Sequence, residues 1–125
     1  MPSSTTGLSQ GESDFMNATV AVDAGICGFK TSARVVSEND QHVAFDVQSD
    51  CEKISRLGGA LRDQGLIDAY QEISPASAGV VMQAVRSVLT GCCAGCAVPA
   101  GLFKAMQVAA GLALPKDINI RLSNE

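Results

Sequence analysis

Five cysteines in a chain of 125 residues could supply the thiolate ligands that soft metal ions and iron–sulfur clusters prefer. Three of them are crowded into the sequence Gly91-Cys92-Cys93-Ala94-Gly95-Cys96, whereas Cys27 and Cys51 stand alone upstream. The loop contains a Cys-x-x-Cys motif, a spacing that lets two sulfurs reach one metal atom. We expect a metal site formed by Cys27, Cys51, Cys93 and Cys96, with Cys92 as the substitute for Cys93.

The residues around Cys51 predict the start of a helix. Ser49 and Glu52 match the Ser-x-x-Glu capping box, which makes Cys51 the second residue of that helix. Free backbone N–H groups and the positive end of the helix dipole favour a thiolate at such a position. Asp50 is adjacent to this thiol, and we expect it to tune the site without being a ligand.

Glycines accompany the other candidate ligands. Gly28 follows Cys27 in the predicted bend between the first two strands, and Gly95 precedes Cys96 in the cysteine loop. Because glycine has no Cβ, the backbone can turn tightly at both positions and lie close to a bound group. We therefore expect Gly28 and Gly95 to shape the site from outside the ligand set.

Other uses of these thiols stay open. Zinc in a closed four-cysteine site competes with an iron–sulfur cluster, and ligand type alone does not separate the two. Cys93 and Cys96 could instead form a thiol–disulfide redox pair, although a helix rather than a strand is predicted before their loop. Cys27 and Cys51 could also be small buried hydrophobic residues.

Composition and charge exclude several classes of function. The net charge is −4 and the nine Lys and Arg residues are scattered, so we expect no binding to nucleic acids or to anionic membranes. The N-terminus lacks the pattern of a signal peptide, and the longest apolar stretch, residues 102–114, is too short to span a bilayer. We therefore expect a cytoplasmic protein, in which thiols stay reduced. Phosphate-loop and catalytic-triad motifs are absent, so the sequence gives no support for an enzyme.

The elements that must position the cysteines are those of a single α+β domain over residues 16–125, which follows a polar, flexible tail over residues 1–15. Apolar and polar residues alternate over residues 18–22, 30–37 and 43–47, a pattern that predicts three strands of an antiparallel meander. Hydrophobic residues make up 46% of the chain but aromatic residues only 4%, so we expect a core of Val, Leu, Ile and Ala.

Three helices are expected after these strands. The first begins at the capping box and ends near Gly65, and the second extends from Ser74-Pro75 to about Gly91. The third begins at Pro99 and stops before Pro115. A C-terminal alternation then predicts a last strand in the sheet, which contains Ile118, Ile120 and Leu122. The expected order is β-β-β-α-α-α-β, with the helices on one face of the sheet.

This order resembles that of the U-type iron–sulfur cluster scaffolds, the NifU-like and IscU-like family, over residues 20–111. That family has a cysteine-glycine bend between its first two strands, a second cysteine at the turn from sheet to helix, and a ligand group before the last long helix. By this resemblance the three positions correspond to Cys27-Gly28, Cys51 and the cysteine loop. It implies cluster binding, with a redox or cluster-assembly protein, or a second copy of the chain, as partner.

The chain departs from the scaffold pattern at two positions. Phe29 follows the first Cys-Gly pair where the scaffolds have an aspartate that keeps the cluster labile, and a cysteine stands where they have a histidine. The single histidine, His42, falls in a predicted strand and is expected to face solvent. Four cysteine ligands beside an apolar Phe29 favour stable binding of a cluster or metal over its transfer.

A second resemblance is carried by the stretch from Cys96-Ala97-Val98-Pro99 to Gly111-Leu112-Ala113-Leu114-Pro115-Lys116-Asp117. This stretch is similar to a small, uncharacterised family of cysteine-containing proteins from anaerobes, and it is more distinctive than the order of elements. The resemblance implies four positions like those of metal ligands and no assigned reaction.

Overall fold

A four-stranded antiparallel sheet forms one layer of the fold, with strand order β1-β2-β3-β4. The computed structural model describes residues 16–74 and 79–124, so the predicted tail over residues 1–15 lies outside the described residues. The α+β class is confirmed. The strands are β1 (Met16–Asp23), β2 (Lys30–Ser37), β3 (His42–Ser49) and β4 (Ile67–Asp68).

The first three strands form the predicted meander, and their alternation decides which face is buried. Ala18 of β1 pairs with Val35 of β2, which pairs with Phe45 of β3, and all three side chains are buried. The residues between them point to the opposite, exposed face, as the two-residue period of a strand requires. Asp40, with a φ of 61°, provides the left-handed position in the turn between β2 and β3.

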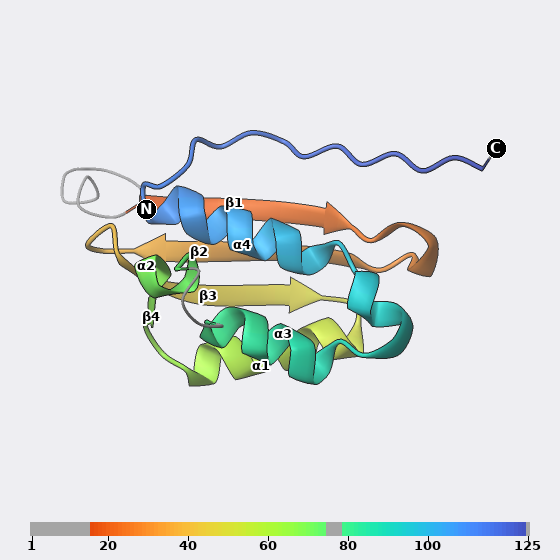
Figure 1. Cartoon of the computed structure of the whole chain (residues 1–125), viewed down its shortest axis with the longest axis horizontal. Helices are drawn as coiled ribbons and strands as arrows, with labels where there is room; N and C mark the ends of the chain where they lie inside the picture. The colour runs from red at the N-terminus through yellow and green to blue at the C-terminus, as the bar shows by residue number, and fades with distance from the viewer. Residues whose placement is uncertain (1–15, 75–78, 125) are drawn as a thin grey trace.

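The helices form a second layer on the buried face of the sheet. They are α1 (Glu52–Asp63), α2 (Ala69–Glu72), α3 (Val80–Val88) and α4 (Val98–Ala109), and two short 3₁₀ helices, η4 (Gly25–Cys27) and η5 (Gly91–Gly95), occupy loops. α4 packs on β1 and β2, α1 packs on β3, and α3 packs on α1 (Figure 1). One face of the sheet is therefore covered, as the sequence predicted.

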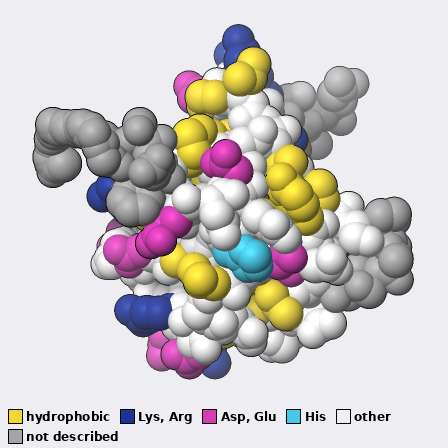
Figure 2. All heavy atoms as spheres, turned by 90° about the vertical axis from the view of Figure 1, so that its left-hand side faces the viewer, with side chains coloured by type: hydrophobic (Ala, Val, Ile, Leu, Met, Phe, Trp, Pro, Cys, Tyr) yellow, Lys and Arg dark blue, Asp and Glu magenta, His cyan; other side chains and the backbone are white. Residues whose placement is uncertain are grey.

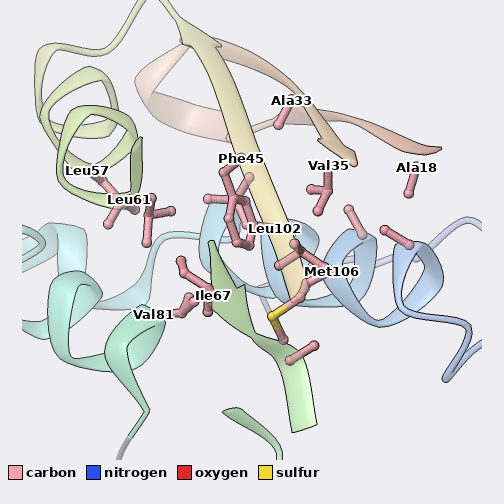
Figure 3. Close-up of a cluster of buried hydrophobic side chains, with 14 of the residues drawn as sticks. Ala18, Ala33, Val35, Phe45, Leu57, Leu61, Ile67, Val81, Leu102 and Met106 are labelled. Carbon is pink, nitrogen blue, oxygen red and sulfur yellow. The ribbon is translucent and has the colours of Figure 1, made fainter. Parts of the chain in front are cut away.

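The hydrophobic core lies between these two layers, as Figure 3 shows. Aliphatic side chains dominate it, with Phe45 as its aromatic member. The largest fully buried residues are Ile54, Leu57, Leu61, Leu102, Met106, Val35, Val43, Val81 and Val98.

Two glycines let the helices lie close to the strands. A Cβ on Gly58 of α1 would be 2.8 Å from Val47 Cβ, and a Cβ on Gly101 of α4 would be 2.8 Å from Val22 Cγ2. Since real Cβ atoms do not approach this closely, both contacts require glycine. Gly101 is near the start of α4 and Val22 is near the end of β1, so α4 begins beside the end of β1.

The prediction of a C-terminal strand is wrong. Residues 113–124 form neither helix nor strand, and the place beside β3 is occupied instead by β4. The chain leaves α4 through Gly111, which has a φ of 76°, and the backbone N–H of Leu112 donates to the Gln107 carbonyl at 2.8 Å. These contacts fix the direction in which the chain leaves α4, and the backbone of residues 113–124 makes no hydrogen bond with the described strands. Residues 67–72, between α1 and α3, form β4 and α2.

The start of α1 also differs from expectation. α1 begins at Glu52 with Cys51 as its N-cap, because Ser49 is the last residue of β3 and its hydroxyl oxygen lies 2.8 Å from Thr31 Oγ1. The capping box is therefore not formed. α3 is described from Val80, and its expected start at Pro75 lies outside the described residues.

The described part of the chain contains one segment, Gly91–Ala109, that is long and apolar enough to cross a membrane by length and composition alone. It comprises η5 and α4, and α4 buries Leu102 and Met106 completely against the sheet. A core helix passes the same test.

Candidate functional site

The three cysteine-bearing segments, namely η4, the start of α1, and η5 with Cys96, lie at the same end of the molecule (Figure 1). The strand pairing fixes half of this arrangement, because Asp23 at the end of β1 pairs with Lys30, and Thr31 next to it pairs with Ser49 at the end of β3. α1 begins directly after β3, and α4 begins beside the end of β1. Figure 1 shows η4, η5 and the starts of α1 and α4 together at its right-hand end.

Cys27 lies in a tight bend between β1 and β2. Gly25 and Gly28 both have left-handed backbone conformations, with φ of 86° and 79°, and Gly28 N–H donates to the Gly25 carbonyl at 2.9 Å. Asp23 Oδ1 accepts a hydrogen bond from Gly25 N–H at 3.1 Å, which makes Asp23 part of the turn. Cys27 is exposed, and its neighbour Phe29 is 42% exposed. The thiol is therefore accessible at the tip of a bend that needs its glycines.

Cys51 is the N-cap of α1 and is partly buried against the hydrophobic core. The expectation that it is the second residue of the helix is wrong by two positions, since the helix begins at Glu52. Its backbone N–H donates to Ser49 Oγ at 3.0 Å, and its carbonyl accepts from Ser55 N–H at 2.9 Å. Asp50 is exposed, with its N–H bonded to the Lys30 carbonyl at 3.2 Å. The thiol thus belongs to the first turn of a helix that faces this end.

The cysteine loop is a 3₁₀ helix, η5, that leads into α4. Gly91, with a φ of 65°, provides the left-handed position of the loop, whereas Gly95 does not adopt one, so Gly91 rather than Gly95 makes the tight turn. Cys96 N–H donates to the Cys93 carbonyl at 3.1 Å across one turn. Cys93 and Cys96 pack partly against the core, and Cys92 is exposed.

The sulfur of Cys96 accepts a hydrogen bond from the backbone. Val98 N–H lies 3.5 Å from Cys96 Sγ, and Val98 is the first residue of α4. This N–H is one of those that have no partner within the helix. Hydrogen bonds of this kind to cysteine sulfur are among the contacts that tune metal and cluster sites.

The thiols do not form a closed cage in the described residues. All five cysteines are free, and among the described residues no three His, Cys, Asp or Glu side chains are close enough together to hold a metal ion. The donor chemistry nevertheless fits a soft metal, because three partly buried thiols and one accessible thiol belong to segments that meet at one end. Binding by all four would require the two cysteine loops to move.

His42 and the cysteines lie at opposite ends of the sheet. His42 is the first residue of β3, whereas Cys51 comes two residues after the last residue of that strand. The histidine is drawn in cyan in Figure 2, which views the molecule from the left-hand side of Figure 1. His42 is half-buried, with its N–H bonded to Asn39 Oδ1 at 2.8 Å and its Nδ1 3.1 Å from Asn39 Nδ2. The predicted strand position is confirmed, although the side chain is less exposed than expected. His42 belongs to a turn far from the thiols.

A polar hollow of about 450 Å³ beside the cysteine end was not expected from the sequence. It lies on the uncovered face of the sheet, and Lys30, Gln48 and Asp50 are its longest polar side chains. The outward positions of β2 and β3 carry the signal for it, because in both strands they are polar near the cysteine end.

Residues 18–122 match the model of a family described as a family of unknown function, DUF6951. The match includes all five cysteines and most of the C-terminal segment. No functionally curated protein and no solved structure matches the chain. None of these comparisons assigns a function to the chain.

Proposed function

The chain belongs to the DUF6951 family, whose function is unknown, and we propose that it is a metal-binding protein whose favoured occupant is an iron–sulfur cluster held by cysteine thiolates. The proposed ligands are Cys27, Cys51, Cys93 and Cys96. When bound, such a cluster supplies electron transfer or sulfur-ligated iron chemistry. The cysteines hold it, and the segments around them determine its access to solvent.

One observation carries this proposal, namely the convergence of three cysteine-bearing segments at one end of the fold (Figure 1). These segments are far apart in sequence. Cysteines that served only as small hydrophobic residues would not be expected to lie together at one end of the fold. Two helices, α1 and α4, begin at the same end, and N-terminal N–H groups favour anionic groups such as thiolate-bound clusters.

The burial of the thiols supports the choice among them. Cys51, Cys93 and Cys96 are partly buried against one core, a setting that limits solvent access to a bound group, whereas Cys92 is exposed. Cys93 is therefore the better candidate ligand of the adjacent pair. Cys27 is exposed on a short bend, so it is the ligand that would close over a bound group.

The choice of cluster over zinc depends on the resemblance to the U-type scaffolds. That resemblance is now limited to the order of the ligands and the α+β class, because the order of strands differs and the fourth strand is β4. Phe29, in the place of the scaffold aspartate, favours stable binding over transfer. Zinc in a four-cysteine site is the second candidate occupant.

Serine substitution of each proposed ligand tests the proposal. We expect the wild-type chain, purified without oxygen, to be brown and to contain iron and acid-labile sulfide. Cys27→Ser, Cys51→Ser, Cys93→Ser and Cys96→Ser should each lose at least half of the iron and the visible absorption, because a thiolate ligand is removed. The measurements are metal analysis, sulfide analysis and the visible spectrum.

Cys92→Ser is the matched control, since it removes a neighbouring thiol that is exposed. It should retain the wild-type iron content. If Cys92→Ser loses the metal and Cys93→Ser keeps it, the two residues exchange roles. A colourless wild-type protein with one zinc favours the second occupant, and a chain that binds neither metal when both are offered anaerobically contradicts the proposal.

A thiol–disulfide redox function is the alternative from another class. The observation in its favour is that a backbone hydrogen bond joins Cys93 and Cys96 across one 3₁₀ turn directly before a helix. In this case Cys27→Ser and Cys51→Ser would leave a reversible disulfide intact, whereas Cys96→Ser would abolish it. Thiol titration after oxidation and reduction separates this function from metal binding.

A further inference from the structure

We propose that the C-terminal segment, residues 116–122, adds as an extra strand to the free edge of β1 in a second copy of the chain, and that two copies exchange these segments to form a symmetric dimer. This inference is independent of the metal site. It rests on a segment that has the pattern of a strand and on a strand edge of the same chain, neither of which pairs with any other part of the chain that the structure describes.

The C-terminal segment has a strand pattern without a partner. Its even-numbered positions are mostly apolar, and its odd-numbered positions are mostly polar, the period of a strand with one buried face. Within the described residues, the backbone of residues 113–124 makes no hydrogen bond. The apolar side chains are exposed, with relative exposures of 90% for Leu114, 53% for Ile118, 66% for Ile120 and 95% for Leu122.

The edge of β1 offers the complementary backbone groups. Among residues 16–74 and 79–124, β1 is the first strand of the sheet and pairs on one side only, with β2. Ala24 N–H donates to the Phe29 carbonyl at 3.2 Å, and hydrogen-bonded pairs alternate along an antiparallel ladder. Thr19 and Ala21 therefore direct their N–H and C=O groups to the free edge. β1 contains none of the lysines or prolines that commonly protect an exposed edge.

The side chains along this edge are incompletely buried. Val20 and Val22 of β1 face α4, because a Cβ on Gly101 would lie 3.2 Å from Val20 Cγ2 and 2.8 Å from Val22 Cγ2, yet both valines are only partly buried. Phe103 and Val108 of α4 are also partly buried. A strand added beside β1 would bring its own apolar row into this layer and complete it.

The occupant is a second copy because the segment does not pair within its own chain. In Figure 1 it runs along the β1 side of the molecule, outside the sheet. Its exit from α4 is fixed by the left-handed Gly111 and by the hydrogen bond of Leu112 N–H to the Gln107 carbonyl. Since every copy carries one such segment and one free edge, two copies can satisfy both with twofold symmetry. The family match extends to residue 122, so the segment belongs to the family's domain.

Sedimentation velocity of the full chain, with reductant and chelator to exclude disulfide and metal bridges, tests the dimer. The wild-type chain should sediment as a dimer at micromolar concentration. Ile118→Asp/Ile120→Asp should weaken dimerisation at least 100-fold, because it places two charges in the apolar row. Asn119→Asp/Ser123→Asp adds the same charge on the polar side of the segment and should leave the dimer intact.

Ala21→Pro tests the acceptor edge. It removes an N–H that points away from β2, so the ladder to β2 stays intact while pairing on the free edge is blocked. We expect a folded monomer, checked by circular dichroism. In a mixed sample of labelled and unlabelled chains, methyl contacts between Ile118 or Ile120 and Val20 should be between copies. A monomeric wild type, a dimer that survives Ile118→Asp/Ile120→Asp, or contacts found only within one copy would each overturn the proposal.

Discussion

At the scale of single residues, Glu72, in the segment between α1 and α3, binds the first backbone N–H groups of α3. It is 8% exposed, and its carboxylate accepts hydrogen bonds from Val80 N–H at 2.9 Å and Val81 N–H at 2.8 Å. The side chain thus satisfies the first N–H groups of α3 from eight residues away, and its negative charge complements the positive end of the helix. A Cβ on Gly79 would meet the Glu72 carboxylate, so a side chain at position 79 would displace this carboxylate.

Glu72→Ala should destabilise the protein by about 3 kcal/mol, because one buried and one partly buried N–H group lose a charged acceptor. Glu72→Gln keeps one oxygen acceptor without the charge, so we expect about half of that loss. The free energy of unfolding in urea measures both. Glu38→Ala, at an exposed turn position, is the control and should have little effect. Equal stability of Glu72→Ala and the wild type would show that the α3 N-terminus does not depend on this carboxylate.

At the scale of elements, two adjacent glycines in α1 have opposite roles. A Cβ on Gly58 would be 2.8 Å from Val47 Cβ, whereas a Cβ on Gly59 would meet nothing within 4 Å. Gly58 is therefore required by the packing of α1 on β3, and Gly59 only adds flexibility to the unfolded chain.

We expect Gly58→Ala to lower the free energy of unfolding by about 1–3 kcal/mol through overpacking. Gly59→Ala should raise it by about 0.5–1 kcal/mol, since alanine is the better helix former. The pair provides its own control, because the same methyl group is added to neighbouring residues of one helix. Thermal and urea unfolding measure the two changes, and two shifts of the same sign would contradict the described packing.

At the scale of the whole molecule, the core and the thiol end are separate. The buried core is aliphatic and is formed between the sheet and the helices, while the cysteines lie at its margin or outside it. Small domains that fold only around a metal lack such a core. We therefore expect this core to hold the fold together whether or not a metal binds to the thiols.

The metal-free chain should consequently stay folded. With chelator and reductant present, we expect a far-ultraviolet circular dichroism spectrum like that of the metal-loaded protein and a cooperative thermal transition. Leu57→Ala, which removes a side chain with 0% exposure, should cost about 2–5 kcal/mol and gives the comparison for a core defect. Loss of the cooperative transition on metal removal alone would mean that the thiol site holds the fold together.

Local sequence patterns were sufficient to predict most of the strands and helices of this protein. The alternation over residues 30–37 predicted β2 to the residue. Thr31, Ala33 and Val35 are all buried, because a strand has a period of two wherever one face is covered. Helical periodicity predicted α1 and α4 nearly as well, with Pro99 at the start of α4. The cysteines and their candidate chemistry were also evident from residue type and spacing.

The tertiary structure decided which of these local preferences were satisfied. Ser49 was used in the sheet rather than as a helix cap, and the C-terminal alternation found no neighbour in its own sheet, because both outcomes depend on residues distant in sequence. Convergence of the cysteine segments at one end likewise follows from strand pairing and helix packing. Sequence determines which groups can bind or pair, whereas the positions of distant segments determine which partners they meet.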